Sequence, residues 1–368
     1  MERVPKRILK AAVVLCAAVL PVLFIVSRST NEQFENVLEE KSKRTLRSRG
    51  PRIAILVVIE PNTALDFYGH AMSTVGCYAR IWNYEFRIVS SYDYQDECPH
   101  KDKFFRRHCV AARILGSYDY ILFLDADIGV VNPKKRIEDF LDANAEIIFY
   151  DRFYNWEVMA GAYLAKNTNW TEHFLDGFAN YEFRLPKSFH GTDNGALHAY
   201  LAEVILGRNH TGLGSCLNIY GRSRDFDDLF MYEACIRKLL GNSTRFGPIK
   251  ILKKGTAWAR DNWITNSLWS PERDFMMHNW KLTQMITYKH TPLPLTAESN
   301  SEWYNPLADY VDLYRCIPGN TTWSYDKNMI AKREIIDRRL EEFAAIVEKQ
   351  QTIMLERLSK YLSEMSND

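Results

Sequence analysis

Uninterrupted apolar runs alternate with amphipathic segments through the first half of the chain. Residues 53–59 (Ile-Ala-Ile-Leu-Val-Val-Ile) and 120–124 (Tyr-Ile-Leu-Phe-Leu) contain no charge, which is typical of parallel strands buried on both faces. Two shorter strands are predicted at 86–89 and 146–150, and helices at 64–82, 102–115 and 134–141. This alternation predicts an α/β fold with a doubly wound, mostly parallel sheet that places ligands at its carboxyl edge.

The second half of the chain is less regular and rich in tryptophan until a long helix is predicted from residue 326 to residue 365. Its apolar residues, spaced by three and four positions, are Ile336, Leu340, Phe343, Val347 and Met354. Such a stripe either forms a coiled-coil seam between two copies of the chain or docks on the parent domain. The sequence leaves both alternatives open. The tryptophans are more typical of core packing than of sugar stacking.

The N-terminus predicts a membrane anchor. Residues 11–26 carry no charge, and Arg3, Lys6, Arg7 and Lys10 precede them, so we expect a cytoplasmic tail (1–10), a signal anchor (11–26) and a polar stem (27–50). The alternative is a cleaved signal peptide. The net charge of +1 gives no electrostatic case for binding nucleic acid.

Cysteines and glycosylation sequons agree with a secretory location. The six cysteines outside the predicted anchor are Cys77, Cys98, Cys109, Cys216, Cys235 and Cys316. They allow three disulfides in any of 15 connectivities. Sequons at Asn169, Asn209, Asn242 and Asn320 support the same compartment.

Two carboxylates follow the 120–124 strand. Asp125 and Asp127 would lie at the carboxyl edge of the sheet, where they can hold Mn²⁺ or Mg²⁺ together with substrate phosphates. The alternative is that both acids cap the helix predicted near Lys134.

Three further groups are candidates for the same site. Asp193 and Asn194 lie between glycines in a predicted loop, although Asp193 can instead cap a helix over 196–204. His278 can complete a metal site, and Lys281 can meet a diphosphate. Gly161 lies in an apolar run and indicates close approach of the backbone to a neighbour or ligand.

Together these residues resemble glycosyltransferases of the GT-A fold, in particular family 34. The strand with Asp125-Ala-Asp127, then Ala160-Gly-Ala-Tyr163, Thr192-Asp-Asn-Gly-Ala-Leu197 and a late His278 follow that family's order. The chain is more closely similar to a nematode family of predicted nucleotide-diphospho-sugar transferases. This likeness covers about residues 52–285. The motifs that carry it are Arg106-Arg-His-Cys109, residues 118–133, Phe149-Tyr-Asp-Arg-Phe-Tyr-Asn-Trp156 and Trp269-Ser-Pro-Glu-Arg-Asp-Phe275.

The resemblance implies a manganese-dependent transfer of a sugar from a nucleotide-sugar donor to a glycan or glycoprotein acceptor, with retention at the anomeric carbon. It places Asp125, Asp127 and His278 at the metal, Lys281 and Gly161 at the donor, and Asp193 with Asn194 beside the donor sugar. Asn194 departs from the family's glutamine. Trp280-Lys281 stands where the family has a glycine-bearing turn.

We therefore expect a GT-A domain over 51–325 and a C-terminal helix over 326–368, in a type II protein of the Golgi membrane. The donor is expected to be a UDP-sugar. A non-catalytic luminal sugar-binding or scaffold protein of the same fold is the alternative. A haloacid-dehalogenase phosphatase fits less well because Gly129 replaces the threonine or valine usual four residues after the first acid.

Overall fold

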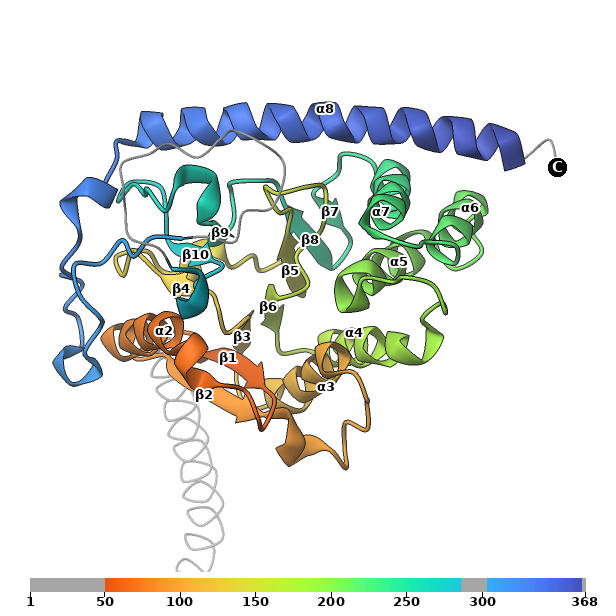
Figure 1. The fold of residues 1–368 in the computed structure, drawn as a ribbon. Helices are drawn as coiled ribbons and strands as arrows, with labels where there is room; N and C mark the ends of the chain where they lie inside the picture. Colours follow the sequence, from red (N-terminus) through yellow and green to blue (C-terminus); the bar gives the residue numbers. More distant parts are fainter. Residues whose placement is uncertain (1–49, 286–302, 366–368) are drawn as a thin grey trace, which may run out of the picture. The chain divides into compact units, whose positions relative to one another are not determined.

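The computed structural model describes residues 50–285 and 303–365. From Arg52 onward these residues belong to one compact unit, a mixed α/β fold built on a large, mostly parallel sheet (Figure 1). The strands of this sheet are β1 (Ile53–Ile59), β2 (Glu85–Ser90), β3 (Tyr120–Leu124), β5 (Ile147–Tyr150), β6 (Ala162–Lys166), β7 (Arg245–Phe246) and β8 (Ile249–Leu252). A smaller sheet contains β4 (Gly129–Val130), β9 (Ala259–Asp261) and β10 (Met276–His278).

The order of the large sheet is β2-β1-β3-β6-β5-β8-β7. β2, β1, β3, β5 and β8 point the same way, whereas β6 and β7 run against their neighbours. The carboxyl ends of the five parallel strands therefore share one edge.

Helices and 3-10 turns connect these strands. The helices are α2 (Gly69–Trp82), α3 (Lys103–Leu115), α4 (Asn169–Ala179), α5 (Thr192–Leu206), α6 (Thr211–Tyr220), α7 (Phe226–Leu240) and α8 (Arg333–Met365). The 3-10 turns are Leu65–Phe67, Ser91–Tyr94, Ile137–Phe140, Asn180–Arg184, Trp263–Thr265, Leu282–Gln284, Leu313–Arg315 and Lys327–Met329.

The central strands are buried on both faces, as their apolar runs predict. Successive side chains of a strand point to opposite faces, so Ala54 and Leu56 join the core shared with α3 to α7. Ile55 and Val57 join the core shared with α2. The predicted helix at 134–141 is wrong, because only the single 3-10 turn Ile137–Phe140 forms and Leu141 is extended.

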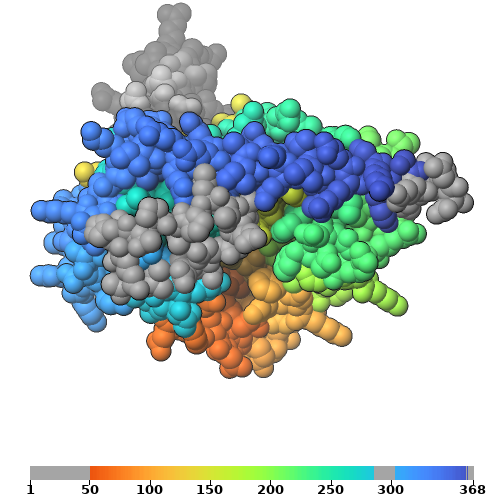
Figure 2. Space-filling model, turned by 45° about the horizontal axis from the view of Figure 1, so that its top comes forward, coloured from red at the N-terminus to blue at the C-terminus, as the bar shows by residue number. Residues whose placement is uncertain are grey.

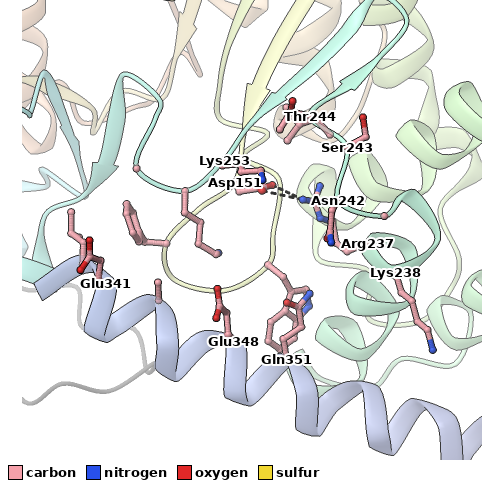
Figure 3. A pocket seen from close by; sticks show the side chains of 18 of the residues that line it. Asp151, Arg237, Lys238, Asn242, Ser243, Thr244, Lys253, Glu341, Glu348 and Gln351 are labelled. Carbon is pink, nitrogen blue, oxygen red and sulfur yellow. Dashed lines mark hydrogen bonds and ion pairs between the residues drawn. The ribbon is translucent and has the colours of Figure 1, made fainter. Parts of the chain in front are cut away.

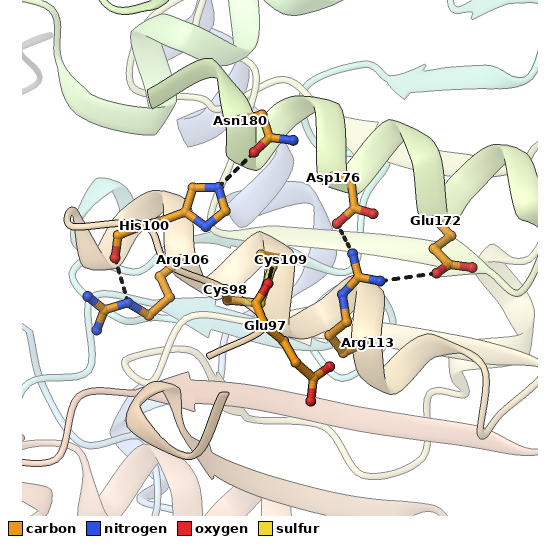
Figure 4. Close-up of a disulfide and its surroundings, with 9 residues drawn as sticks. All are labelled: Glu97, Cys98, His100, Arg106, Cys109, Arg113, Glu172, Asp176 and Asn180. Atoms are coloured by element: carbon orange, nitrogen blue, oxygen red, sulfur yellow. Dashed lines mark hydrogen bonds and ion pairs between the residues drawn. A yellow bond between two sulfur atoms is a disulfide. The ribbon is translucent and has the colours of Figure 1, made fainter. Parts of the chain in front are cut away.

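The positions of α3 and α4 are fixed by polar contacts as well as by the core. Arg113 of α3 pairs with Asp176 and Glu172 of α4, and His100 contacts the side chain of Asn180 at 3.2 Å (Figure 4). The Cys98–Cys109 disulfide joins α3 to the loop that precedes it. These contacts hold α3 against α4 and against the loop that precedes α3.

Two further disulfides complete the pairing of the six cysteines. Cys216–Cys235 joins α6 to α7, and Cys77–Cys316 joins α2 to a segment 239 residues later. The sequence left this connectivity open.

The apolar stripe of α8 docks on the parent domain. Ile336, Leu340, Phe343, Val347 and Met354 are buried with Trp263 and α7 residues, and α8 crosses the surface as a continuous ridge (Figure 2). The coiled-coil alternative, in which this stripe forms a homodimer seam, is therefore wrong, because the stripe already has its partner.

No helix within 50–285 and 303–365 is both long and apolar enough to cross a bilayer. The predicted tail, the anchor at 11–26 and all but the last residue of the stem lie outside the described residues.

Candidate metal centre

Asp125 and Asp127 follow β3 directly and lie at the carboxyl edge of the large sheet. The backbone N–H of Asp125 donates to the carbonyl of Gly161 at 2.7 Å. A Cβ atom on Gly161 would overlap the Asp125 carboxylate, which confirms the close backbone approach predicted there. The alternative that the two acids cap a helix near Lys134 is wrong, because no helix begins there.

The small sheet brings His278 to the same place. β10 ends at His278 and pairs with β4, which begins two residues after Asp127. The backbone N–H of Trp280 donates to the carbonyl of Asp127 at 2.8 Å. One ligand atom each of Asp125, Asp127 and His278 lies within 4.8 Å of the others, so the structure assembles the three residues predicted to hold metal.

His278 is held between two carboxylates. Its Nε2 is 3.3 Å from Asp127 and its Nδ1 is 3.2 Å from Asp261. Burial alone would lower the pKa of His278, but Asp127 and Asp261 together raise it to about 9. A carboxylate on the second nitrogen is the usual way in which a metal-binding histidine is oriented.

Lys281 contacts the other side of Asp127, with its Nζ 3.2 Å from the carboxylate. Burial would raise the pKa of Asp127, but His278 and Lys281 hold it well below its ordinary value. Burial raises the pKa of Asp125, against the opposing effect of Arg107.

Arg107 of α3 bridges the metal-site acids and Asp193. Its guanidinium pairs with Asp125 and, at 2.5 Å, with Asp193, and His108 contacts the same Asp193 oxygen at 3.0 Å. Burial would raise the pKa of Asp193, yet Arg107 and His108 lower it to about 2. Burial lowers the pKa of His108 to about 4.

The predicted loop around Asp193 is wrong. Gly191 adopts a left-handed conformation (φ 61°) and α5 begins at Thr192, so Asp193 and Asn194 lie in the first helical turn. Asp193 is not the cap either, because Gly191 occupies the N-cap position and the Asp193 carboxylate pairs with Arg107. The side-chain oxygen of Asn194 is buried and accepts no hydrogen bond from the described residues.

The departure at Trp280-Lys281 has a local explanation. Asn279 takes the left-handed conformation (φ 76°) that glycine usually supplies in a tight turn. The ring of Trp280 packs over Gly129, where any Cβ would overlap it. Trp280 is therefore a packing residue, as are the fully buried Trp258, Trp269 and Trp303.

A cavity of about 230 Å³ opens beside the metal-site residues at the ends of β1 and β3. Its lining includes Tyr68, Lys103, Arg107, Asp125, Asp127 and Lys281. It thus combines an aromatic ring, three cations and the two acids of the metal site.

The donor set of this centre fits a divalent cation. The two carboxylates suit a hard divalent cation and the imidazole suits a transition metal. The backbone N–H of Asp125 donates to Gly161, which has no side chain to displace the Asp125 carboxylate. An incoming ion would replace the contact between His278 and Asp127, as both groups then ligate it.

Two residues of the centre were missed by reasoning from the sequence. Asp261 contacts His278 from β9, and no local pattern around it indicates a site. Arg107 stands within the Arg106-Arg-His-Cys109 motif that carries the family resemblance. Its position gave one available signal, because Arg107 is a charged residue close to the buried positions Phe105 and His108 of an amphipathic helix. Such a position indicates that the charge has a partner.

Comparison with known proteins assigns a family. Residues 75–294 match the family described as "Protein of unknown function, DUF273", over more than half of the chain. The chain belongs to the DUF273 family. No curated protein matches this member of DUF273.

Two solved structures are weakly similar to this chain. The first, "crystal structure of a glycosyltransferase involved in the glycosylation of the major capsid of PBCV-1", is 15% identical, with a TM-score of 0.37 over 62% of this chain and 93% of its own. The second, "Crystal Structure of A197 from STIV", is 14% identical, with a TM-score of 0.22 over 34% of this chain and 67% of its own. At these scores the likeness assigns no activity.

Proposed function

We propose that this DUF273 protein is a metal-dependent glycosyltransferase that moves a sugar from a nucleotide-diphosphate donor, UDP-linked, to a glycan or glycoprotein acceptor. The observation that carries the proposal is the convergence of Asp125, Asp127 and His278 within 4.8 Å at the carboxyl edge of the sheet. This is where α/β sheets bind their ligands.

The residues around this centre suit a donor with a charged leaving group. A bound Mn²⁺ or Mg²⁺ would neutralise charge that develops on the nucleotide diphosphate. Lys281 and Arg107 line the adjoining cavity and would add positive charge beside the diphosphate. The Arg107 side chain is only 11% exposed, and a fixed charge acts more strongly where water is excluded. Tyr68 offers an aromatic face for the base.

The donor sugar would meet Asn194 and the Arg107–Asp193 pair. The unpartnered amide oxygen of Asn194 would accept a hydrogen bond from a sugar hydroxyl, which removes the cost of leaving it unpaired. Asp193 would keep Arg107 oriented toward the reaction centre. Retention at the anomeric carbon rests on the family resemblance alone, and NMR of the first product formed tests it.

We also propose a luminal, type II location in the Golgi. The uncharged residues 11–26 with preceding basic residues and the three disulfides support it. Protease treatment of sealed microsomes tests this topology. Digestion of the C-terminal domain with protection of residues 1–7 would contradict it.

The donor site is tested by calorimetric titration of the full chain with UDP and UDP-sugars, with and without Mn²⁺. We expect binding that requires Mn²⁺ and is lost in Asp127→Asn. The exposed Asp96→Asn is the matched control and should bind as the wild type does. Binding of sugars without any nucleotide or Mn²⁺ requirement would instead favour the non-catalytic sugar-binding alternative.

A further inference from the structure

A larger cavity, of about 830 Å³, lies between α8 and the ends of β5, β8 and α7. Its volume is in the upper range of small-molecule sites. Figure 3 shows Glu348 and Gln351 rising from α8 toward Asp151, Lys253 and Asn242 on the opposite wall. We call it the α8 cavity.

The α8 cavity has free charges of both signs on opposite walls. Lys238 and Lys253 are exposed on the strand and α7 side, and Glu341 and Glu348 are exposed on α8. None of the four makes an ion pair with another described residue. An anionic ligand would be opposed by the glutamates, and a cationic ligand by the lysines.

A ligand rich in hydroxyls satisfies both walls. Each hydroxyl donates and accepts hydrogen bonds, so one hydroxyl of such a ligand can accept from Lys253 while another donates to Glu348. Gln351 and Asn242 add amide groups of the same dual character. We propose that the α8 cavity binds a neutral oligosaccharide.

The α8 cavity is separate from the metal centre but shares a loop with it. Asp151 pairs with Arg237 in the cavity wall, whereas the next residue, Arg152, pairs with Asp261 beside His278. The void lined by Arg152, Asp261 and His278 between the two sites measures about 10 Å³, enough for a single water. A sugar chain therefore does not pass from one site to the other by this route.

Two sources supply a neutral oligosaccharide at this position. One is the acceptor glycan, which rests on the proposed function. The other is a glycan on Asn242 of this chain, because Asn242 begins an Asn-Ser-Thr sequon and lines the cavity.

The test uses an array of neutral hexose and N-acetylhexosamine chains, the same chains carrying sialic acid, and short peptides of mixed charge. The proteins are the full chain produced in a glycosylating cell and its Asn242→Gln variant. We expect Asn242→Gln to retain neutral chains. If the wild type retains neutral chains equally well, the cavity is open and its ligand is a free glycan. If only Asn242→Gln retains them, the glycan on Asn242 occupies the cavity of the wild type.

Two neighbouring residues of α8 provide a matched pair of variants in the Asn242→Gln background. Ala344 lines the cavity, whereas Ala345 does not line it and is exposed. Ala344→Trp should lower retention at least tenfold, and Ala345→Trp should leave it unchanged. Glu348→Gln replaces a carboxylate by an amide of nearly the same size and should lower retention of neutral chains about fivefold. This variant provides the test if Ala344→Trp does not fold.

Three outcomes would overturn the proposal. They are preferential retention of sialylated chains or peptides, no retention at all, and retention that neither Ala344→Trp nor Glu348→Gln lowers. Mn²⁺-dependent UDP binding, measured on the same proteins, separates the two claims. Oligosaccharide retention without UDP binding would leave the cavity assignment standing while the proposed function fails. UDP binding without oligosaccharide retention would leave the proposed function standing while the cavity assignment fails.

Discussion

The carboxyl edge of the sheet carries charge in two regions that are organised in opposite ways. Around β3, Asp127, His278 and Asp261 are buried, and His278 contacts both carboxylates directly. Around β5 and β8, Lys253 and Glu348 are exposed and face each other across the α8 cavity. Burying a charge costs several kcal/mol unless it is compensated, so the first arrangement exists only because each group has a partner.

Under the two proposals, the buried cluster is the site for chemistry and the open cavity is the site for recognition. In the buried cluster, partners fix each group and shift its pKa, as functional sites commonly require. In the open cavity, charges remain hydrated until a ligand arrives, so they can be satisfied by hydroxyl groups. Variants in the buried cluster should therefore have larger effects than variants in the cavity.

Replacement of Asp127 should have the largest effect. Asp127→Ala removes a metal ligand and the partner of both His278 and Lys281. Mn²⁺-stimulated hydrolysis of UDP-sugars should fall about a thousandfold, the equivalent of several kcal/mol of charge stabilisation. A folded variant that hydrolyses at the wild-type rate would remove this cluster from the mechanism, and Asp96→Asn should match the wild type.

Loss of Arg107 should come next, as a loss of stability. Arg107→Ala leaves Asp193 buried without its main partner and should lower the free energy of unfolding by about 3 kcal/mol or more, measured by urea titration. The double variant Arg107→Ala/Asp193→Asn should recover part of this loss. Exposed Arg338→Ala is the control. Equal stability of the single variant and the wild type would show that the pair is not coupled.

Asp261 should affect metal binding through His278, in addition to pairing with Arg152. Asp261→Asn removes the carboxylate that orients the imidazole and should weaken Mn²⁺ binding about 10- to 100-fold, measured by calorimetry. Exposed Asp227→Asn should bind Mn²⁺ normally. Unchanged affinity in Asp261→Asn would mean that the fold alone positions His278.

The smallest effect concerns pH and His108. Its pKa is lowered from 6.5 to about 4 by burial, so between these values the unfolded state binds more protons and stability falls as the pH falls. Between pH 7 and pH 5 the wild type, with chelator present, should lose about 2 kcal/mol more than His108→Gln. Parallel losses in urea titrations of the two proteins would show that His108 is not buried as a neutral group.

Local sequence patterns predicted β1, β2, β3 and β5 and the connecting helices α2 and α3, but they did not predict β6, β7 or β8. The runs at 53–59 and 120–124 are buried on both faces, so they contain no polar residues and are easily recognised. The segment 134–141 resembles a helix in composition. The segment forms only one turn. Before this turn the Asn132 side chain accepts a hydrogen bond from the backbone N–H of Lys134, and after it Leu141 is extended.

The candidate site was predictable where ligands follow a strand or stand in a motif. Asp125, Asp127 and His278 were found in this way and meet in space. Asp261 and the bridging role of Arg107 were not predicted. Arg107 and Asp193 are 86 positions apart, so no local sequence pattern indicates that they pair. The α8 cavity likewise depends on how α8 crosses the strand ends.

The Cys77–Cys316 disulfide imposes an order on biosynthesis. Cys98–Cys109 and Cys216–Cys235 span 11 and 19 residues, so each pair can close soon after it is translated. Cys77 must wait for a partner 239 residues away, which at 5–20 residues per second is about 10–50 s. During that interval its thiol is exposed to incorrect pairing with Cys98 or Cys109. Correct oxidation of this chain therefore depends on an isomerase or on early closure of the Cys98–Cys109 loop.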